Sequence, residues 1–330
     1  MNRNYLVLSF IVAMSMIFAG CSSQSDAQTD TGAEGYRAVA SADDCFIAVG
    51  TGGRIDRINF DDSYETYESA ITETLNAVDC YNGVYFAVGN NGTIVSSSSS
   101  EVSFGKKSSG TREDLLAAAG FKGGFFAAGR GGLLLRSVDG DKWNKVDINV
   151  ENDIVTMAAN DGYLFALTRE GQIISSIDGE TFSVQNYNEE FEGYNEYKYW
   201  FENITSLGET FFITGSLQGY EDVPMIMMSS TGEVWMPRAI SEINDKPSAD
   251  FLPLKLGQVG IGGGELVAPV NGGRIISITD CSSCNILRDV DNAEITGLAY
   301  DVDWVMLVGE GFWFDCVESD SLIITEAEME

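Results

Sequence analysis

The chain has 330 residues, of which 44% are hydrophobic, and its 36 glycines against 5 prolines are typical of a globular protein rich in tight turns. With 19 basic and 50 acidic residues, the formal net charge is −31, which argues against nucleic acid or anionic lipid as a general partner. Histidine is absent, and this excludes Ser-His-Asp and Cys-His catalysis and every histidine-containing zinc site. The acidic balance indicates a solvated surface, with binding of cations or of a basic partner as the alternative.

The N-terminus has the features of an export signal. Arg3 precedes an apolar run over 5–18 that is too short for a transmembrane helix. The small residues before Cys21 resemble the cleavage site of a bacterial lipoprotein, in which this cysteine becomes the lipidated first residue; an ordinary secretory signal is the alternative. Because Ser22 follows the cysteine, the resemblance implies the outer membrane. We therefore expect a lipoprotein signal peptide over 1–20 and an envelope location, periplasmic or surface-facing.

A short polar tether follows the signal. Residues 22–34 are small and polar and show no apolar periodicity, so segment 21–35 is expected to be flexible. Its root-mean-square reach is roughly 20 Å, from the rule of 5–6 Å times the square root of the residue number. The remaining segment, 36–330, is predicted to be one globular domain held close to the membrane by the lipid anchor alone.

One pattern recurs along this domain: an apolar run, a glycine turn and a second apolar run. The turn glycines of the aligned units are Gly53, Gly92, Gly132, Gly171, Gly273 and Gly311. Successive gaps are 39, 40, 39, 102 and 38 residues, and the long gap contains a degenerate copy at 211–235. Seven units with a period near 40 and four short strands each predict an all-β fold, a seven-bladed β-propeller of four-stranded antiparallel blades. Because each unit has its own four strands, the ring is expected to close by packing rather than by an exchanged strand.

The turn between the third and fourth strands carries the most specific motif, Ser-x-Asp-Gly-x-x-aromatic, at 137–143 and 176–182. The aspartate can accept hydrogen bonds from the turn, the glycine supplies positive φ, and the aromatic ring is expected to pack the turn onto the blade. The structural turn residues are Asp139, Gly140, Trp143, Asp178, Gly179 and Phe182. These aspartates are predicted to be structural rather than catalytic.

This motif resembles the Asp-box turn of BNR and sialidase-like propellers. It is especially similar to the short variant in the photosystem II assembly-factor-like branch, a WD40/YVTN/BNR-like family, and the resemblance covers nearly all of 37–326. It implies a non-enzymatic propeller that holds another protein, without a cofactor or a metal. Nothing in the sequence indicates photosynthesis, so the partner is expected among envelope proteins.

Two other functions remain open. A sialidase-like or glycosidase-like hydrolase acting on glycans shares the fold, although the family's Phe/Tyr-Arg-Ile-Pro signature is missing here. Divalent-cation binding through acidic loops is the third possibility, but no D-x-D-x-D-G loop occurs.

The cysteines suggest disulfides. In the sixth unit Cys281 and Cys284 occupy the turn position, which predicts a local disulfide in place of the aromatic residue, with a thioredoxin-type redox pair as the alternative. Cys45 and Cys80 lie in adjacent units and are candidates for a second bridge. Cys316 is then left as a buried thiol in the third strand of unit seven.

Four arginines recur at equivalent turn positions and are expected to project to one face of the propeller: Arg54, Arg130, Arg169 and Arg274. The planar guanidinium suits carboxylates of a partner; the alternative is that each arginine pairs with an acidic loop beside it.

Two insertions, 186–203 and 240–252, are expected to reach the same face. The first carries five aromatic residues among glutamates: Tyr187, Tyr194, Tyr197, Tyr199 and Trp200. Because such residues are typical anchors of interfaces, we expect a partner surface here, with a lid over the channel or mere decoration as alternatives.

Overall fold

The structure, a computed structural model, describes residues 33–42, 44–67, 69–98, 104–190, 198–218, 223–240, 242–243, 246–247, 255–262, 265–278, 283–289, 294–301 and 303–322. The predicted signal peptide, Cys21 and most of the predicted tether lie outside these ranges. Within them, no helix is both long enough and apolar enough to cross a membrane.

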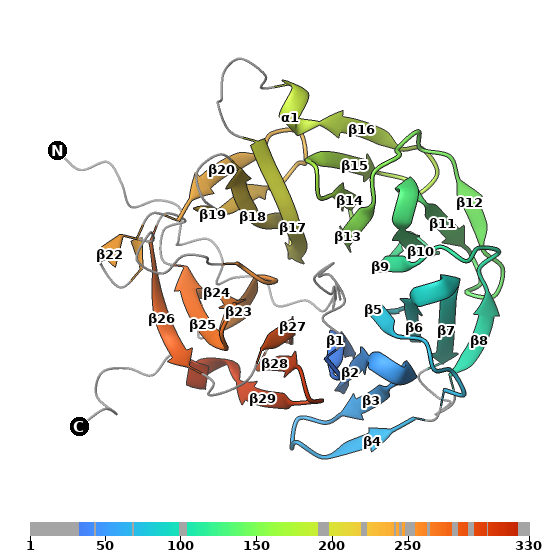
Figure 1. Cartoon of the computed structure of the whole chain (residues 1–330), viewed down its shortest axis with the longest axis horizontal. Coiled ribbons are helices and arrows are strands. Elements are labelled where there is room, and N and C mark those ends of the chain that lie inside the picture. The colour runs from blue at the N-terminus through green and yellow to red at the C-terminus, as the bar shows by residue number, and fades with distance from the viewer. Residues whose placement is uncertain are drawn as a thin grey trace.

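Seven sheets stand around a central axis as the blades of a propeller (Figure 1), which confirms the predicted fold. In each blade the first strand in sequence lies nearest the axis, and we call the strands a to d from the inside outward. Blades 1 to 3 consist of β1 (Tyr36–Ala42), β2 (Cys45–Gly50), β3 (Ile55–Ile58) and β4 (Tyr64–Thr66); β5 (Leu75–Tyr81), β6 (Val84–Gly89), β7 (Thr93–Ser98) and β8 (Gly105–Ser108); and β9 (Leu115–Phe121), β10 (Gly124–Gly129), β11 (Leu134–Ser137) and β12 (Asn144–Val146).

The other blades follow the same order. Blades 4 and 5 consist of β13 (Ile154–Ala159), β14 (Leu164–Thr168), β15 (Gln172–Ser176) and β16 (Ser183–Asn186), and of β17 (Lys198–Leu207), β18 (Thr210–Gln218), β19 (Val223–Ser229) and β20 (Met236–Ala239). Blades 6 and 7 consist of β23 (Gly260–Gly262), β24 (Glu265–Val270), β25 (Arg274–Ile278) and β26 (Ser283–Asp289), and of β27 (Ile295–Tyr300), β28 (Trp304–Gly309) and β29 (Phe314–Glu318).

Blades 6 and 7 depart from the regular pattern. The second insertion, expected to be a loop, contains β21 (Glu242–Ile243) and β22 (Lys246–Pro247), and β21 extends blade 6 by pairing in parallel with β26. Blade 7 shows three strands within the described residues, so its expected outer strand lies outside them.

The core is divided among the blade interfaces. In the described part of the chain, seven apolar clusters are found, one between each pair of neighbouring blades around the ring. The b strands are buried on both faces, as β10 shows with every residue from Gly124 to Gly129 buried. Their small alanines let one sheet approach the next closely, while the phenylalanines fill the remaining space.

A glycine ends the b strand where the chain has no room for a side chain. An added Cβ would lie 2.0 to 2.4 Å from the carbonyl oxygen of the residue just before the a strand, in an equivalent place in four blades: Gly50, Gly89, Gly129 and Gly309. In blade 5 a similar approach, 2.0 Å, joins Gly215 inside β18 to the carbonyl oxygen of Trp200 inside β17. In blade 3 the next N–H, that of Arg130, donates to this same oxygen, on Asp114, at 3.0 Å. The glycine therefore lets two strands of one blade meet at the start of each turn.

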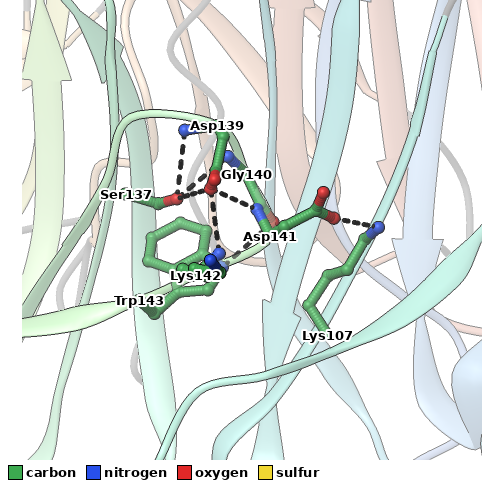
Figure 2. A network of polar contacts seen from close by, with 7 residues as sticks. All are labelled: Lys107, Ser137, Asp139, Gly140, Asp141, Lys142 and Trp143. Carbon is green, nitrogen blue, oxygen red and sulfur yellow. Dashed lines mark hydrogen bonds and ion pairs between the residues drawn. The ribbon is translucent and has the colours of Figure 1, made fainter.

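The Asp-box turn of blade 3 is closed by its own side chains (Figure 2). Asp139 accepts hydrogen bonds from the N–H groups of Asp141 and Lys142, both at 2.9 Å, and the hydroxyl of Ser137 accepts from the N–H of Gly140 at 2.9 Å. The indole N–H of Trp143 donates to the carbonyl of Gly140 at 3.2 Å. The equivalent turn of blade 4 repeats this arrangement around Asp178.

The aromatic residue of each such turn also contacts the preceding blade, which the sequence did not indicate. The ring of Trp143 in blade 3 lies 6.3 Å from that of Phe86 in blade 2. Phe182 lies 6.2 Å from Phe126, one blade back. Blade 5 keeps this contact between blades although its turn lacks the aspartate. Its turn tryptophan, Trp235, lies 5.5 Å from the ring of Phe165 in blade 4.

The ring closes between blades 7 and 1 without an exchanged strand among the described residues, because β1 to β4 come from consecutive segments. Side chains pack across this seam, and the N–H of Gly311 donates to the carbonyl of Glu34 at 2.7 Å. The hydroxyl of Thr296 donates to the carbonyl of Tyr36 at 2.8 Å, and the ring of Tyr36 meets that of Phe312 edge-on at 5.3 Å. Strand register places Phe312, not the predicted Gly311, in the turn-glycine position, with φ of 56°. A bulky residue in this left-handed conformation is strained, so its contacts across the seam must hold it there.

Substitution of Gly129 tests the close approach inside the blade. In Gly129→Ala the new Cβ would lie 2.0 Å from a backbone oxygen, so backbone must shift, and we expect a loss of about 1–3 kcal/mol in the free energy of unfolding. Gly105→Ala is the control, because its Cβ meets nothing nearer than the Ser96 carbonyl oxygen at 4.0 Å. Urea denaturation checks both; equal midpoints for the two variants would contradict the model of close approach.

The Asp-box carboxylates predict a dependence of stability on pH. The Thr181 hydroxyl and the N–H groups of Thr181 and Glu180 hold the pKa of Asp178 well below its usual range. Because the folded-state pKa is the lower one, this stability is complete above the unfolded pKa of about 3.9 and is lost as the pH falls through the folded value. Asp178→Ala should therefore lower the Tm at neutral pH, and the difference from wild type should close only in strong acid. The control is Asp161→Ala, an exposed site in the same blade, which should leave the Tm unchanged. A difference in Tm between Asp178→Ala and wild type that stays the same down to strong acid would contradict this role of Asp178.

Candidate functional site

The turns between the b and c strands form one face of the propeller, which we call the turn face. Carboxylates on the residue just before an a strand cap these turns from the next blade. Asp114 accepts from the N–H of Asn91 at 2.9 Å, and Asp153 accepts from the N–H of Gly131 at 2.8 Å. Glu294 does the same for Gly272 at 3.2 Å. Acidic side chains are thus part of the structure of this face.

Arg130 lies in the blade 3 turn, between two of these carboxylates. Its guanidinium is 2.7 Å from Asp153 and 3.7 Å from Asp114, and its side chain is 54% exposed. Both carboxylates also accept backbone N–H groups, so they are fixed independently of the arginine. The guanidinium is therefore held in place while much of it stays open to solvent.

Arg169 occupies the corresponding position in blade 4. Its guanidinium lies 3.2 Å from Glu202 and 5.8 Å from the centre of the Trp200 ring, and its carbonyl accepts from the N–H of Phe201 at 3.0 Å. The half-buried indole and the arginine therefore form one polar and aromatic unit at the boundary between blades 4 and 5.

Arg54 lies at the seam between blades 7 and 1. Its guanidinium donates to the fully buried Asp56 at 2.7 Å and lies 5.3 Å from the ring centre of Phe312. The hydroxyl of Tyr36 donates to the same carboxylate. Burial, together with Asp56, raises the pKa of this tyrosine well above its usual range, so the hydroxyl remains protonated. This arginine offsets a buried charge.

The predicted arginine group is thus divided among separate ion pairs. Arg54, Arg130 and Arg169 come from blades 1, 3 and 4, and each contacts its own carboxylate. Arg274 begins β25, opposite Asp289 of β26. Arg54, Arg130 and Arg169 therefore follow the alternative considered from the sequence, in which each arginine pairs with a nearby acidic residue. Arg130 is the most exposed of these three.

The first insertion is anchored more deeply than expected. Tyr187 begins the helix α1 (Tyr187–Glu190), and Tyr199 already belongs to β17; both rings are buried and meet edge-on at 5.0 Å. Asn188 binds the two ends together, since its amide donates to the Tyr199 carbonyl at 2.9 Å and its oxygen accepts from the Tyr199 N–H at 2.7 Å. These tyrosines therefore pack in the core and are not exposed partner anchors. Trp200 remains accessible, while Tyr194 and Tyr197 lie outside the described residues.

The predicted Cys45–Cys80 bridge is not formed. Both residues contribute to the apolar cluster between blades 1 and 2, and burial raises the pKa of the Cys45 thiol to about 11, which disfavours the thiolate needed for exchange. Cys316 lies in the third strand of blade 7, as expected, but half-buried rather than buried; burial raises its pKa to about 12. The side chains of Cys281 and Cys284 lie outside what the structure describes.

The part of the chain that the structure describes contains no group of three or more acidic or cysteine side chains able to hold a metal ion. The residues that sequence reasoning missed are the capping acids of the turn face, Asp114, Asp153 and Glu294, and the acidic partner of Arg169, Glu202. The sequence could have indicated the capping acids by their position, because each lies just before an a strand in the unit that follows a glycine turn.

The comparisons with known proteins agree with this fold. No family model matches the chain, and no curated protein matches it. Among solved structures, YCF48 bound to a D1 peptide is similar with a TM-score of 0.64 and 10% identity, covering 93% of this chain and 97% of that one. YCF48 from Cyanidioschyzon merolae gives a TM-score of 0.61 and 10% identity over 88% and 96% of the two chains. The WD40 propeller domain of Doa1 gives 0.59 and 11% over 92% and 99%. At such identities the likeness shows the fold alone.

Arg54 and Arg130 should differ in their contribution to the free energy of unfolding, because only Arg54 pairs with a buried carboxylate. Arg54→Ala leaves the buried Asp56 carboxylate without its cation, so we expect a loss of about 3 kcal/mol in unfolding free energy. Arg130→Ala removes a largely solvated pair and should cost under about 1 kcal/mol. Thermal and urea denaturation at neutral pH measure both; a larger loss for Arg130→Ala would refute the assignment of roles.

Proposed function

We propose that this protein is a non-enzymatic binding or assembly propeller that holds a segment of another protein on its turn face. The observation that carries the proposal is a set of partly exposed, pre-positioned groups in blades 3 to 5: Arg130, Arg169 and Trp200. Fixed guanidinium and indole groups are typical anchors of protein interfaces, because little side-chain freedom is lost when a partner binds.

The similarity in fold supports the proposal. One of the similar structures is a propeller with a peptide bound, YCF48 with a D1 peptide, and the present chain matches it along nearly the whole length of both. The partner itself is not carried over by this likeness, and we propose an envelope protein. The insertion that contains α1 borders the same site, because Asn188 donates to the carbonyl of Glu170 in the blade 4 turn at 2.8 Å.

We further propose that the propeller is a lipoprotein of the outer membrane, held through Cys21. The apolar run, the small residues before that cysteine and the polar tether support this. Multiple acyl chains would supply stable anchoring, and the tether would leave the turn face free to orient toward a neighbouring membrane protein.

A hydrolase of the sialidase type receives less support. Such an enzyme needs several arginines gathered around one substrate carboxylate, whereas Arg54, Arg130 and Arg169 each contact a different acidic residue of this chain.

Co-purification from detergent-solubilised membranes tests the partner surface. The full chain serves as bait, and mass spectrometry identifies what it recovers. Arg130→Glu combined with Trp200→Ala should reduce recovery of a specific partner by about tenfold or more, as expected when two interface anchors are lost.

The matched control reverses an exposed arginine and truncates an exposed apolar residue elsewhere on blade 5, in β20: Arg238→Glu with Met236→Ala. It should recover the partner as wild type does. Equal recovery by both double variants, with unchanged circular dichroism, would place the partner elsewhere. A Cys21→Ala bait that still pellets with membranes would contradict the lipid anchor without affecting the turn face.

A further inference from the structure

The outer rim of blades 2 and 3 is basic, although the protein is strongly acidic. Segment 104–146 holds eight of the 19 lysines and arginines and only four acidic residues, so its net charge is +4 in a chain of net charge −31. Four of these cations gather on the rim, which we call the lysine rim: Lys106, Lys107, Lys142 and Lys145.

Two outer strands bring these lysines together. Lys106 and Lys107 lie on β8, and Lys145 lies on β12. Figure 1 shows the two strands as neighbours on the rim, and a parallel bridge joins Ser108 at the end of β8 to Lys142. Lys107 forms an ion pair with Asp141 across the two blades (Figure 2).

The lysine rim is open to a partner. Lys142 and Lys145 are exposed, and neither forms an ion pair with a described residue. Lys106 pairs with Glu73 at 3.2 Å, but its side chain remains 54% exposed. In the turn that contains Lys142, the side chain of Val138 is 66% exposed, so the rim also offers an apolar side chain to a partner. At about 0.1 M salt the Debye length is about 10 Å, so acidic surfaces farther away oppose an anionic partner only weakly.

The backbone of the rim favours a polypeptide. Within the described part of the chain, the only ladder partner of β8 is β7 and that of β12 is β11, and the bridge from Ser108 to Lys142 occupies only the end of β8. Each strand therefore keeps an outer edge with N–H and C=O groups for another strand. Lysines on edge strands can also serve to prevent such pairing. The comparable strands β4, β16 and β20 have one basic residue among them, so edge protection alone does not explain this concentration.

We propose that the lysine rim is a docking surface for an extended, acidic segment of a partner polypeptide, distinct from the turn face. The lysines supply charge complementarity, the strand edges supply backbone hydrogen bonds, and Val138 supplies an apolar contact. The inference does not depend on the function proposed for the turn face.

A labelled decaglutamate peptide provides the probe. Fluorescence anisotropy with the full chain at about 0.1 M salt should show binding, and raising the salt to about 1 M should abolish it because the Debye length falls to about 3 Å. The triple reversal Lys106→Glu, Lys142→Glu and Lys145→Glu should weaken binding by about tenfold or more, since each contact is an exposed ion pair.

The matched control makes the same change of charge on exposed residues of blades 5 and 6: Lys198→Glu, Arg238→Glu and Lys255→Glu. Its affinity should stay within about twofold of wild type, because these charges lie away from the rim. Absence of binding by the wild type, or equal losses in the two triple variants, overturns the proposal. Binding to phosphatidylglycerol vesicles without binding to the peptide also overturns it, and assigns the rim to a lipid surface instead.

Discussion

The close approach of the b strand to the start of the a strand is the constraint on which the rest of the molecule depends. It exists because a glycine such as Gly129 has no Cβ, and it fixes where each turn leaves the sheet. The turn then presents its N–H groups to a carboxylate of the next blade, as Gly131 does to Asp153. In blade 3, a steric requirement inside one blade thereby places the turn whose N–H group and arginine meet the carboxylate of the next blade.

The acidic character of the chain acquires a more specific meaning in this context. Several of its carboxylates are structural acceptors: Asp139 and Asp178 close their own turns, and Asp114 and Asp153 join blades. Arginines among them neutralise local charge instead of forming one cationic field. The lysine rim differs because Lys142 and Lys145 form no ion pair with a described residue, so binding at this surface would depend on local charge.

The sequence predicted the scaffold well because glycine spacing and strand length are local properties. It predicted the blade count and the positive-φ turn glycines of blades 1 to 4 and 6, which are Gly53, Gly92, Gly132, Gly171 and Gly273. It did not predict which blade receives the turn aromatic, because the contact of Trp143 with Phe86 joins residues far apart in sequence. Tyr187 and Tyr199 were misjudged for the same reason: aromatic density identifies a packed segment, but burial depends on the neighbouring blade. The register at Phe312 was missed because a glycine stands one position before it.

The aromatic contacts between blades also have a direction. Trp143, Phe182 and Trp235 each reach back to the blade made just before their own. During synthesis the chain emerges from its N-terminus, so each of these blades finds its docking surface already present. The order of the repeats thus favours vectorial folding, in which every new blade is captured by its predecessor and only the seam between blades 7 and 1 must wait for the complete chain.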